Sequence, residues 1–267
     1  MEQALALVKG ITDPGLGINR LREYLQTFIL RSLHASEAFR ALAFVGGTAL
    51  RFLHGLPRFS EDLDFSLVAP DPYDPTVWLS RLKRDLTLSG FQPELTWNEK
   101  RPMNVAWVRI PQLLHIAGFS PRREQKLSIK VEIDTRPPAG GRCERRIVTR
   151  GLTFFVQHHD LASLLAGKLH ALICRPYAKG RDWYDLTWYL SQRPPIVPNL
   201  VLLQNALDQT PGPTKLRAKS WPSLVKKRLA ALDFAEVSRD VIPFLEHQPE
   251  AALLTRENIA TLLKAAG

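Results

Sequence analysis

Apolar side chains recur along this chain with two spacings, one typical of helices and one typical of strands. In residues 18–39 they return every three to four positions, as they do on one face of a helix. In residues 127–134 they alternate with polar side chains, as they do in a half-buried strand. The same reasoning predicts further strands at 41–45, 62–68 and 105–110, and further helices at 48–53 and 77–89.

The second half of the chain has a different pattern, which is mostly helical. Asp160 is a candidate N-cap for a helix at 161–174, and another helix is expected at 182–191. Three or four more helices are expected in 199–267. The predicted fold class is therefore α+β, in which residues 1–155 form a mixed sheet with flanking helices and residues 156–267 form a mostly helical part.

Two carboxylates lie close together in the strand-like segment LDFSL and just before it. Asp62 and Asp64 are two positions apart, so on a strand they point to the same face. Carboxylates held side by side repel each other, and a divalent cation relieves that repulsion. Mg²⁺ is commonly held by one or two carboxylates together with substrate phosphates, so the pair predicts a metal site for Mg²⁺, with Mn²⁺ as an alternative.

A glycine-rich turn precedes this pair. Gly46, Gly47 and Thr48 follow an apolar run and open a short helix, where backbone N–H groups can bind an anion. A basic loop with Arg58 and Ser60 lies between this helix and Asp62. Together these features predict that a nucleoside triphosphate and a metal ion meet here.

This stretch resembles the nucleotidyltransferase superfamily of the DNA polymerase β type, and more closely the AbiEii/AbiGii toxin family. That resemblance implies that Asp62 and Asp64 hold the metal and that Gly46, Gly47, Thr48, Arg58 and Ser60 bind the nucleotide. An edge strand with a glycine turn and solvated acids is the alternative. The matching residues are Gly46, Gly47, Thr48, Ala49, Leu50, Gly55, Arg58, Ser60, Asp62, Leu63, Asp64 and Phe65.

The resemblance also implies a third carboxylate on a neighbouring strand. The strand LSIKVEIDTR places Lys130, Glu132 and Asp134 on one face. Glu132 matches the family position of a group that helps hold the metal and accepts the proton of the attacking hydroxyl. Asp134 competes for this role, and a strand whose polar face meets solvent is the alternative to both.

A second match to the family lies in the helical half. The family has a helix with a central lysine, then a loop and Arg-Asp-x-x-Asp, which correspond here to Lys168, Arg181, Asp182 and Asp185. Lys168 lies in an otherwise apolar helix and needs an anionic partner. The resemblance implies that the partner is the triphosphate, that Arg181 binds the nucleotide and that Asp182 and Asp185 are catalytic. These two carboxylates share a helix face, so they could position Lys168, contact the nucleotide or only cap the helix. An ion pair with Asp182 or Asp185 is the alternative, and the two roles can coexist.

Composition narrows the classes of partner. The chain has 267 residues, a formal net charge of +10 and a pI of about 9.9, which favours a polyanion such as RNA. A cluster of Arg142, Arg145, Arg146 and Arg150 is either a solvated hairpin or an edge that contacts RNA.

Cysteine usage and hydropathy bear on the compartment. Cys143 and Cys174 have no spacing that indicates a disulfide framework or a zinc site. No apolar run reaches the length of a transmembrane helix, and the first residues do not resemble a signal peptide. A cytoplasmic protein without a membrane partner is expected.

The resemblance implies a Mg²⁺-dependent nucleotidyltransferase toxin of a toxin–antitoxin or phage-defence system, with a cognate antitoxin as a partner. Residues 1–155 would form the transferase core, and residues 156–267 would complete the active site. The expected reaction transfers a nucleotide from an NTP to RNA and blocks translation. The resemblance suggests the 3′ end of tRNA as the acceptor. Transfer to a protein hydroxyl is one alternative, and a binding module for nucleotide or RNA without turnover is another.

Overall fold

The chain forms two compact units. The computed structural model describes residues 1–100, 102–212 and 215–266. Unit 1 comprises residues 1–55, 59–137 and 144–158, and unit 2 comprises residues 56–58, 138–143 and 159–267. Each unit is therefore assembled from segments that are separated in the sequence.

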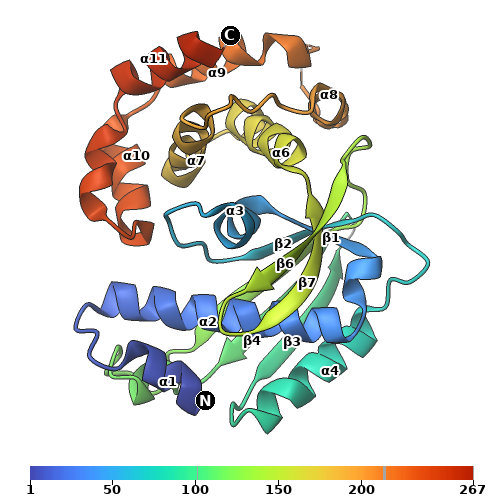
Figure 1. The fold of residues 1–267 in the computed structure, drawn as a ribbon, viewed down its shortest axis with the longest axis vertical. Helices are drawn as coiled ribbons and strands as arrows, with labels where there is room; N and C mark the ends of the chain where they lie inside the picture. Colours follow the sequence, from blue (N-terminus) through green and yellow to red (C-terminus); the bar gives the residue numbers. More distant parts are fainter. Residues whose placement is uncertain (101, 213–214, 267) are drawn as a thin grey trace. The chain divides into compact units, whose positions relative to one another are not determined.

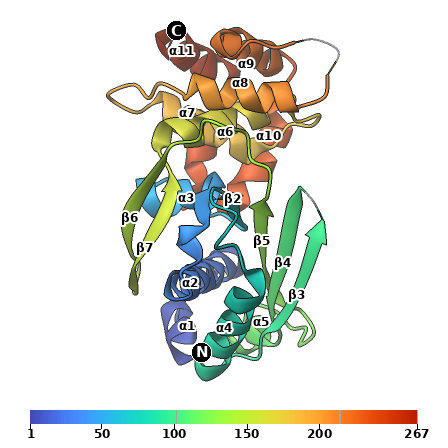
Figure 2. The same ribbon diagram turned by 90° about the vertical axis from the view of Figure 1, so that its right-hand side faces the viewer.

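Unit 1 is built on a mixed sheet of seven strands, in the order β3-β4-β5-β2-β1-β7-β6 (Figures 1 and 2). β2 pairs parallel with β5 and antiparallel with β1, while β1 pairs parallel with β7. The predicted α+β class with a mixed sheet is confirmed. The strands are β1 (Leu42–Val45), β2 (Leu63–Leu67), β3 (Glu94–Lys100), β4 (Met103–Ile110), β5 (Leu127–Asp134), β6 (Cys143–Thr149) and β7 (Thr153–His159).

Three of these strands, β3, β6 and β7, were not among the predicted ones. β6 has the sequence CERRIVT, and of its side chains only Val148 is buried. A strand without an apolar face shows no alternation, so hydropathy alone cannot detect it. Its place at the sheet edge, beside β7, explains how so polar a segment forms a strand.

The long helix α2 packs on β5 and on its neighbour α4 (Figure 2). The helix predicted at residues 18–39 begins and ends earlier in the structure, at Pro14 and Ala35. Asp13 accepts hydrogen bonds from the backbone N–H groups of Gly15 and Leu16, and a proline at the first helical position also favours an earlier start. At the other end Glu37 has a left-handed φ of 58°, which is incompatible with continuing the helix. The helices of unit 1 are α1 (Glu2–Val8), α2 (Pro14–Ala35), α3 (Gly46–His54), α4 (Pro75–Leu88) and α5 (Leu113–Ile116).

Unit 2 is mostly helical, as predicted. The Asp160 side chain accepts a hydrogen bond of 2.7 Å from the backbone N–H of Ser163, so the expected N-cap of α6 is present. α6 packs against α7, α8 and α9 (Figure 1). A Cβ atom on Gly180 would lie 2.0 Å from the carbonyl oxygen of Val237, so a glycine is required where α7 meets α10. The helices are α6 (Leu161–Cys174), α7 (Gly180–Leu190), α8 (Leu200–Gln209), α9 (Trp221–Ala230), α10 (Phe234–Val241) and α11 (Arg256–Ala266).

Two further expectations concern the chain as a whole. Cys143 and Cys174 are free thiols. In residues 1–100, 102–212 and 215–266, no helix has the length and hydropathy needed to cross a membrane.

Candidate functional site

The parallel pairing of β2 with β5 brings two of the predicted metal ligands together. Asp64 lies directly opposite Glu132 in the register, and Ser66 lies opposite Asp134. Paired positions on adjacent strands are about 5 Å apart and their side chains share a face. Glu132 is therefore the immediate neighbour of Asp64, while Asp134 lies one same-face position further along. This register favours Glu132 over Asp134, and its role at a metal stays a prediction.

Asp134 also has a different environment. Its carboxylate accepts a hydrogen bond of 2.9 Å from the backbone N–H of Arg136. Burial raises the pKa of Asp134 above its usual value, although the hydrogen bond from Arg136 acts in the opposite direction. A carboxylate that caps its own turn in this way has a local structural role.

The glycine turn lies against the same carboxylate pair. Gly46 follows β1 with a φ of +79°, and a Cβ atom there would lie 2.3 Å from Oδ2 of Asp64. Val45, the residue before it, is opposite Asp64 in the antiparallel pairing of β1 with β2. The N-cap residue of α3 is Val45, whose side chain makes no capping hydrogen bond to the first backbone N–H groups of the helix. The turn and the acidic pair thus occupy the same end of these strands.

Lys130 introduces a positive charge among the carboxylates. Its Nζ lies 2.6 Å from Oε1 of Glu132. Burial acts to lower the pKa of Lys130, but its hydrogen bond with Glu132 and the charges of Glu132, Asp62 and Asp64 outweigh burial, so the pKa is raised. The negative charges of the three predicted metal ligands thus stabilise the ammonium group of Lys130. A site that stabilises one cation in this way is suited to a metal cation.

The carboxylates do not form a complete cage by themselves. Among the residues that the structure describes, no three His, Cys, Asp or Glu side chains converge closely enough to hold a metal ion. Mg²⁺ does not require such a cage, because substrate phosphates and water complete its octahedral shell. The donor set at Asp62, Asp64 and Glu132 therefore fits a metal that arrives with a triphosphate.

Two residues predicted to bind nucleotide have other contacts in unit 1. Thr48 is fully buried, and its hydroxyl donates a hydrogen bond to the carbonyl oxygen of Asp62. The carbonyl oxygen of Ser60 accepts a hydrogen bond of 3.0 Å from Nε2 of Gln26. The nucleotide contacts of Gly46, Gly47, Thr48 and Ser60 stay predictions.

In unit 2 the second motif forms a buried charge cluster. The Nζ of Lys168 lies 2.7 Å from Oδ1 of Asp182 and 2.6 Å from Oδ2 of Asp185. Burial acts to lower the pKa of Lys168, but the charges of Asp182 and Asp185 raise it, so the lysine is charged. The predicted ion pair exists with both carboxylates rather than with one. A role of Lys168 at a triphosphate stays a prediction.

Arg58 completes this cluster from the segment 56–58. Its Nε and Nη2 each lie 2.6 Å from an oxygen of Asp185, which is the bidentate geometry of strong arginine–carboxylate pairs. Arg58 is 2% exposed, and Asp185 is 0% exposed. The structure therefore gives Arg58 a partner inside unit 2, while its predicted contact with nucleotide is untested.

Sequence reasoning overlooked Arg175, which contacts Asp182 through Nη1. The backbone N–H of Arg181 donates a hydrogen bond of 3.3 Å to Asp240, and the predicted contact of Arg181 with nucleotide stays a prediction. The guanidinium of Arg181 also lies over the ring of Phe244, 4.1 Å from its centroid. Nothing in the local pattern around Arg175 indicates its partner, because the contact depends on how α6 and α7 pack.

Comparison with known proteins places this arrangement in a family. A sequence profile described as nucleotidyl transferase AbiEii toxin, type IV TA system, matches residues 28–260. The chain belongs to the AbiEii family of nucleotidyltransferase toxins. Membership in a type IV toxin–antitoxin family implies a cognate antitoxin as a partner. No curated protein matches the chain.

Solved structures share the fold of this AbiEii-family protein. One is described as a candidate nucleotidyltransferase from H. pylori, with 18% identity and a TM-score of 0.56 over 91% of this chain and 93% of that chain. Another is JHP933 from Helicobacter pylori, with 18% identity and a TM-score of 0.51 over 91% of both chains. At this identity the likeness shows the fold alone.

Gly46→Ala tests the packing of the turn against Asp64. We expect a loss of unfolding free energy clearly larger than for Gly55→Ala, which is the matched control. Both glycines have positive φ, but a Cβ on Gly55 would meet nothing within 4 Å. The control should therefore cost only the conformational strain of about 1–2 kcal/mol. Urea denaturation measures both, and equal losses would contradict the close approach.

Asp185→Asn tests the buried charge cluster of unit 2. Removing the carboxylate leaves Arg58 and Lys168 buried without their shared counter-charge, so we expect a loss of about 3–5 kcal/mol in stability. Asp208→Asn, at an exposed position of α8, should change stability by less than about 0.5 kcal/mol. Thermal and urea unfolding of both variants give the answer, and a near-neutral Asp185→Asn would show that the cluster contributes little.

Proposed function

We propose that this protein transfers a nucleotide from an NTP to RNA, with the 3′ end of tRNA as the acceptor, and so blocks translation. The observation that carries the proposal is the pairing of Asp64 with Glu132 beside the Gly46 turn. Family membership supports the transferase chemistry, and the net charge of +10 supports a polyanionic acceptor.

In the proposed reaction, the acceptor hydroxyl oxygen attacks the α-phosphorus of the NTP in line with the leaving group. The new bond joins that oxygen to the α-phosphorus, and the bond to the bridging oxygen of the β-phosphate breaks, which releases pyrophosphate. Glu132 accepts the proton of the hydroxyl in this scheme. The backbone N–H groups at the start of α3 bind the β- and γ-phosphates, and positioning lowers the barrier.

Asp62, Asp64 and Glu132 would hold Mg²⁺, or Mn²⁺ in its place. Bound there, the cation would neutralise charge on the triphosphate and polarise the reacting phosphoryl group. Lys130 has to share Glu132 with that cation, because its amine occupies one carboxylate oxygen in the structure. The proposal also includes the predicted catalytic roles of Lys168, Asp182 and Asp185 in unit 2, which stay predictions.

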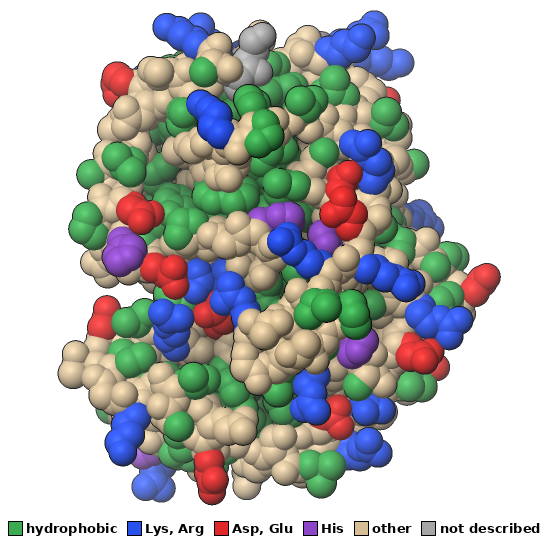
Figure 3. Space-filling view, viewed as in Figure 1, with side chains coloured by type: hydrophobic (Ala, Val, Ile, Leu, Met, Phe, Trp, Pro, Cys, Tyr) green, Lys and Arg blue, Asp and Glu red, His purple; other side chains and the backbone are tan. Residues whose placement is uncertain are grey.

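The surface charge does not by itself identify where an acceptor binds. On the face shown in Figure 3, Lys and Arg side chains are spread over many positions, with Asp and Glu side chains among them. Arg145 and Arg146 on the edge strand β6 are exposed, whereas Nε of Arg142 lies 3.1 Å from Oδ2 of Asp160. The edge strand is therefore the part of the predicted arginine cluster that best suits RNA.

Two alternatives lead to different outcomes of the same assay. A transferase that modifies a protein hydroxyl would use the same carboxylates but label a polypeptide. A binding module without turnover would bind NTP and release no pyrophosphate. Incubation with each labelled NTP, together with total RNA or with lysate, separates the three by which macromolecule acquires label.

Asp64→Asn should reduce nucleotide transfer at least about a hundredfold, because it removes one ligand charge from the proposed metal site. Asp134→Asn is the matched control, since it is the same substitution one same-face position away on the neighbouring strand. It should retain activity within about threefold. Labelled-NTP transfer and pyrophosphate release measure both, and a greater loss at Asp134 would transfer the role to that residue.

Substitution of Arg145 and Arg146 tests whether β6 contacts RNA. If they contact phosphates, replacing both by Gln should reduce the slope of log affinity against log salt by up to about 2. Arg122→Gln with Arg123→Gln removes the same charge from another exposed segment and should leave the slope nearly unchanged. RNA-binding titrations at several salt concentrations give the slopes, and equal slopes for both double variants would exclude β6 as the contact.

A further inference from the structure

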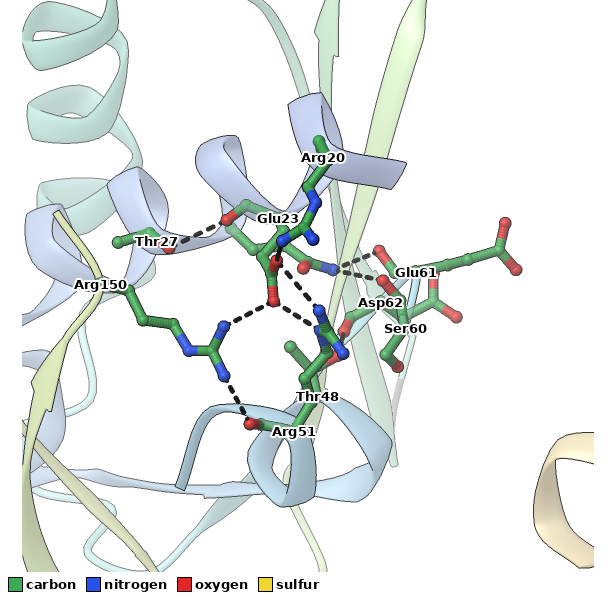
Figure 4. A network of polar contacts seen from close by, with 10 residues as sticks. Arg20, Glu23, Thr27, Thr48, Arg51, Ser60, Glu61, Asp62 and Arg150 are labelled. Carbon is green, nitrogen blue, oxygen red and sulfur yellow. Dashed lines mark hydrogen bonds and ion pairs between the residues drawn. The ribbon is translucent and has the colours of Figure 1, made fainter. Parts of the chain in front are cut away.

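A buried carboxylate on α2 connects three parts of unit 1, which are α2 itself, α3 and the turn that follows β6. Glu23 is 8% exposed, and its Oε1 accepts hydrogen bonds from Nε of Arg51 at 2.5 Å and Nη1 of Arg150 at 2.8 Å (Figure 4). Nη2 of Arg150 also donates to the carbonyl oxygen of Arg51, at 2.8 Å. These contacts connect α2 with α3 and with the turn that follows β6, so α2 cannot shift relative to α3 without exposing or separating charges.

One turn further along α2, Gln26 contacts the loop that leads to the acidic motif. The side chain is 1% exposed, and its Nε2 lies 3.0 Å from the carbonyl oxygen of Ser60 and 3.0 Å from that of Glu61. An amide nitrogen has two hydrogens, so it can donate to both carbonyls at once.

The next carbonyl of the same loop is held from α3. The buried hydroxyl of Thr48 donates a hydrogen bond to the carbonyl oxygen of Asp62 (Figure 4). Three consecutive carbonyl groups, those of Ser60, Glu61 and Asp62, are thus held by two side chains on two helices. The contacts of Glu23 hold α2 and α3 in place relative to each other. The side chains on these two helices therefore fix the position of the backbone at Asp62 before any ligand binds.

We infer that Gln26 and Thr48 are positioning residues that set the Asp62 carboxylate for metal binding. The inference rests on the proposed role of Asp62 as a metal ligand, and it gives Thr48 a side-chain role distinct from phosphate binding. Side chains that orient metal ligands typically change metal affinity by 10–100-fold when they are removed. A purely structural role would change stability and leave the affinity for metal unaltered.

Direct Mn²⁺ binding to the full chain, followed by electron paramagnetic resonance, separates these roles. Gln26→Met keeps the length of the side chain and removes both donors, and we expect Mn²⁺ to bind about tenfold more weakly. Thr27→Val is the matched control on α2. The hydroxyl of Thr27 is also buried, but it donates within the helix to the carbonyl oxygen of Glu23, at 2.9 Å. Its Mn²⁺ affinity should stay within about twofold of wild type.

The Asp62 carbonyl gives a second, independent test, which applies even if Gln26→Met does not fold. Thr48→Ser retains the hydroxyl and should bind Mn²⁺ as wild type does, whereas Thr48→Val should bind it about tenfold more weakly. Equal affinities for these two variants, or wild-type affinity in a folded Gln26→Met, would overturn the inference.

Asp62→Asn, measured alongside, distinguishes failure of the inference from failure of the proposed function. If Asp62→Asn weakens Mn²⁺ binding but Gln26→Met and Thr48→Val do not, the metal site stands and the positioning role is wrong. If Asp62→Asn binds Mn²⁺ as wild type does, Asp62 is not a ligand, and the proposed metal site fails together with the inference. Weaker binding by all three supports both.

Discussion

The parallel pairing of β2 with β5 is the constraint on which the candidate site of this AbiEii-family protein depends. Side chains alternate along a strand, so a shift of one residue would move Glu132 to the opposite face from Asp64. β2 is also held on its other side by β1, where Val45 lies opposite Asp64. That second pairing brings the turn at Gly46 to the acidic pair. One strand between two partners therefore places the carboxylates and the start of α3 together.

Buried charges are organised in the same way in both units. In unit 1 the carboxylate of Glu23 is shared by two arginines, and in unit 2 the carboxylate of Asp185 is shared by Arg58 and Lys168. Burying a charge is costly unless it is paired and hydrogen-bonded, so each cluster is stable in only a narrow range of geometries. Their main physical effect is to define the positions of the helices that carry them, more than to add net stability.

Local pattern was informative where an element has one apolar face or a recognisable cap. The alternation in residues 127–134 predicted β5, and Asp160 predicted the start of α6. The pattern failed where neither signal exists. β6 is polar along almost its whole length, and its strand conformation depends on pairing with β7, which supplies backbone hydrogen bonds that no side chain reports.

By itself, the sequence determined the family, the fold class and which short segments carry the acidic, glycine-rich and lysine-containing motifs. Only the tertiary structure decided which carboxylate faces Asp64, where the hydroxyl of Thr48 is directed and what Arg58 contacts. The bidentate pair of Arg58 and Asp185 joins residues 127 positions apart. Local periodicity describes which face of an element is apolar, whereas contacts between distant segments depend on how those elements pack and register against one another.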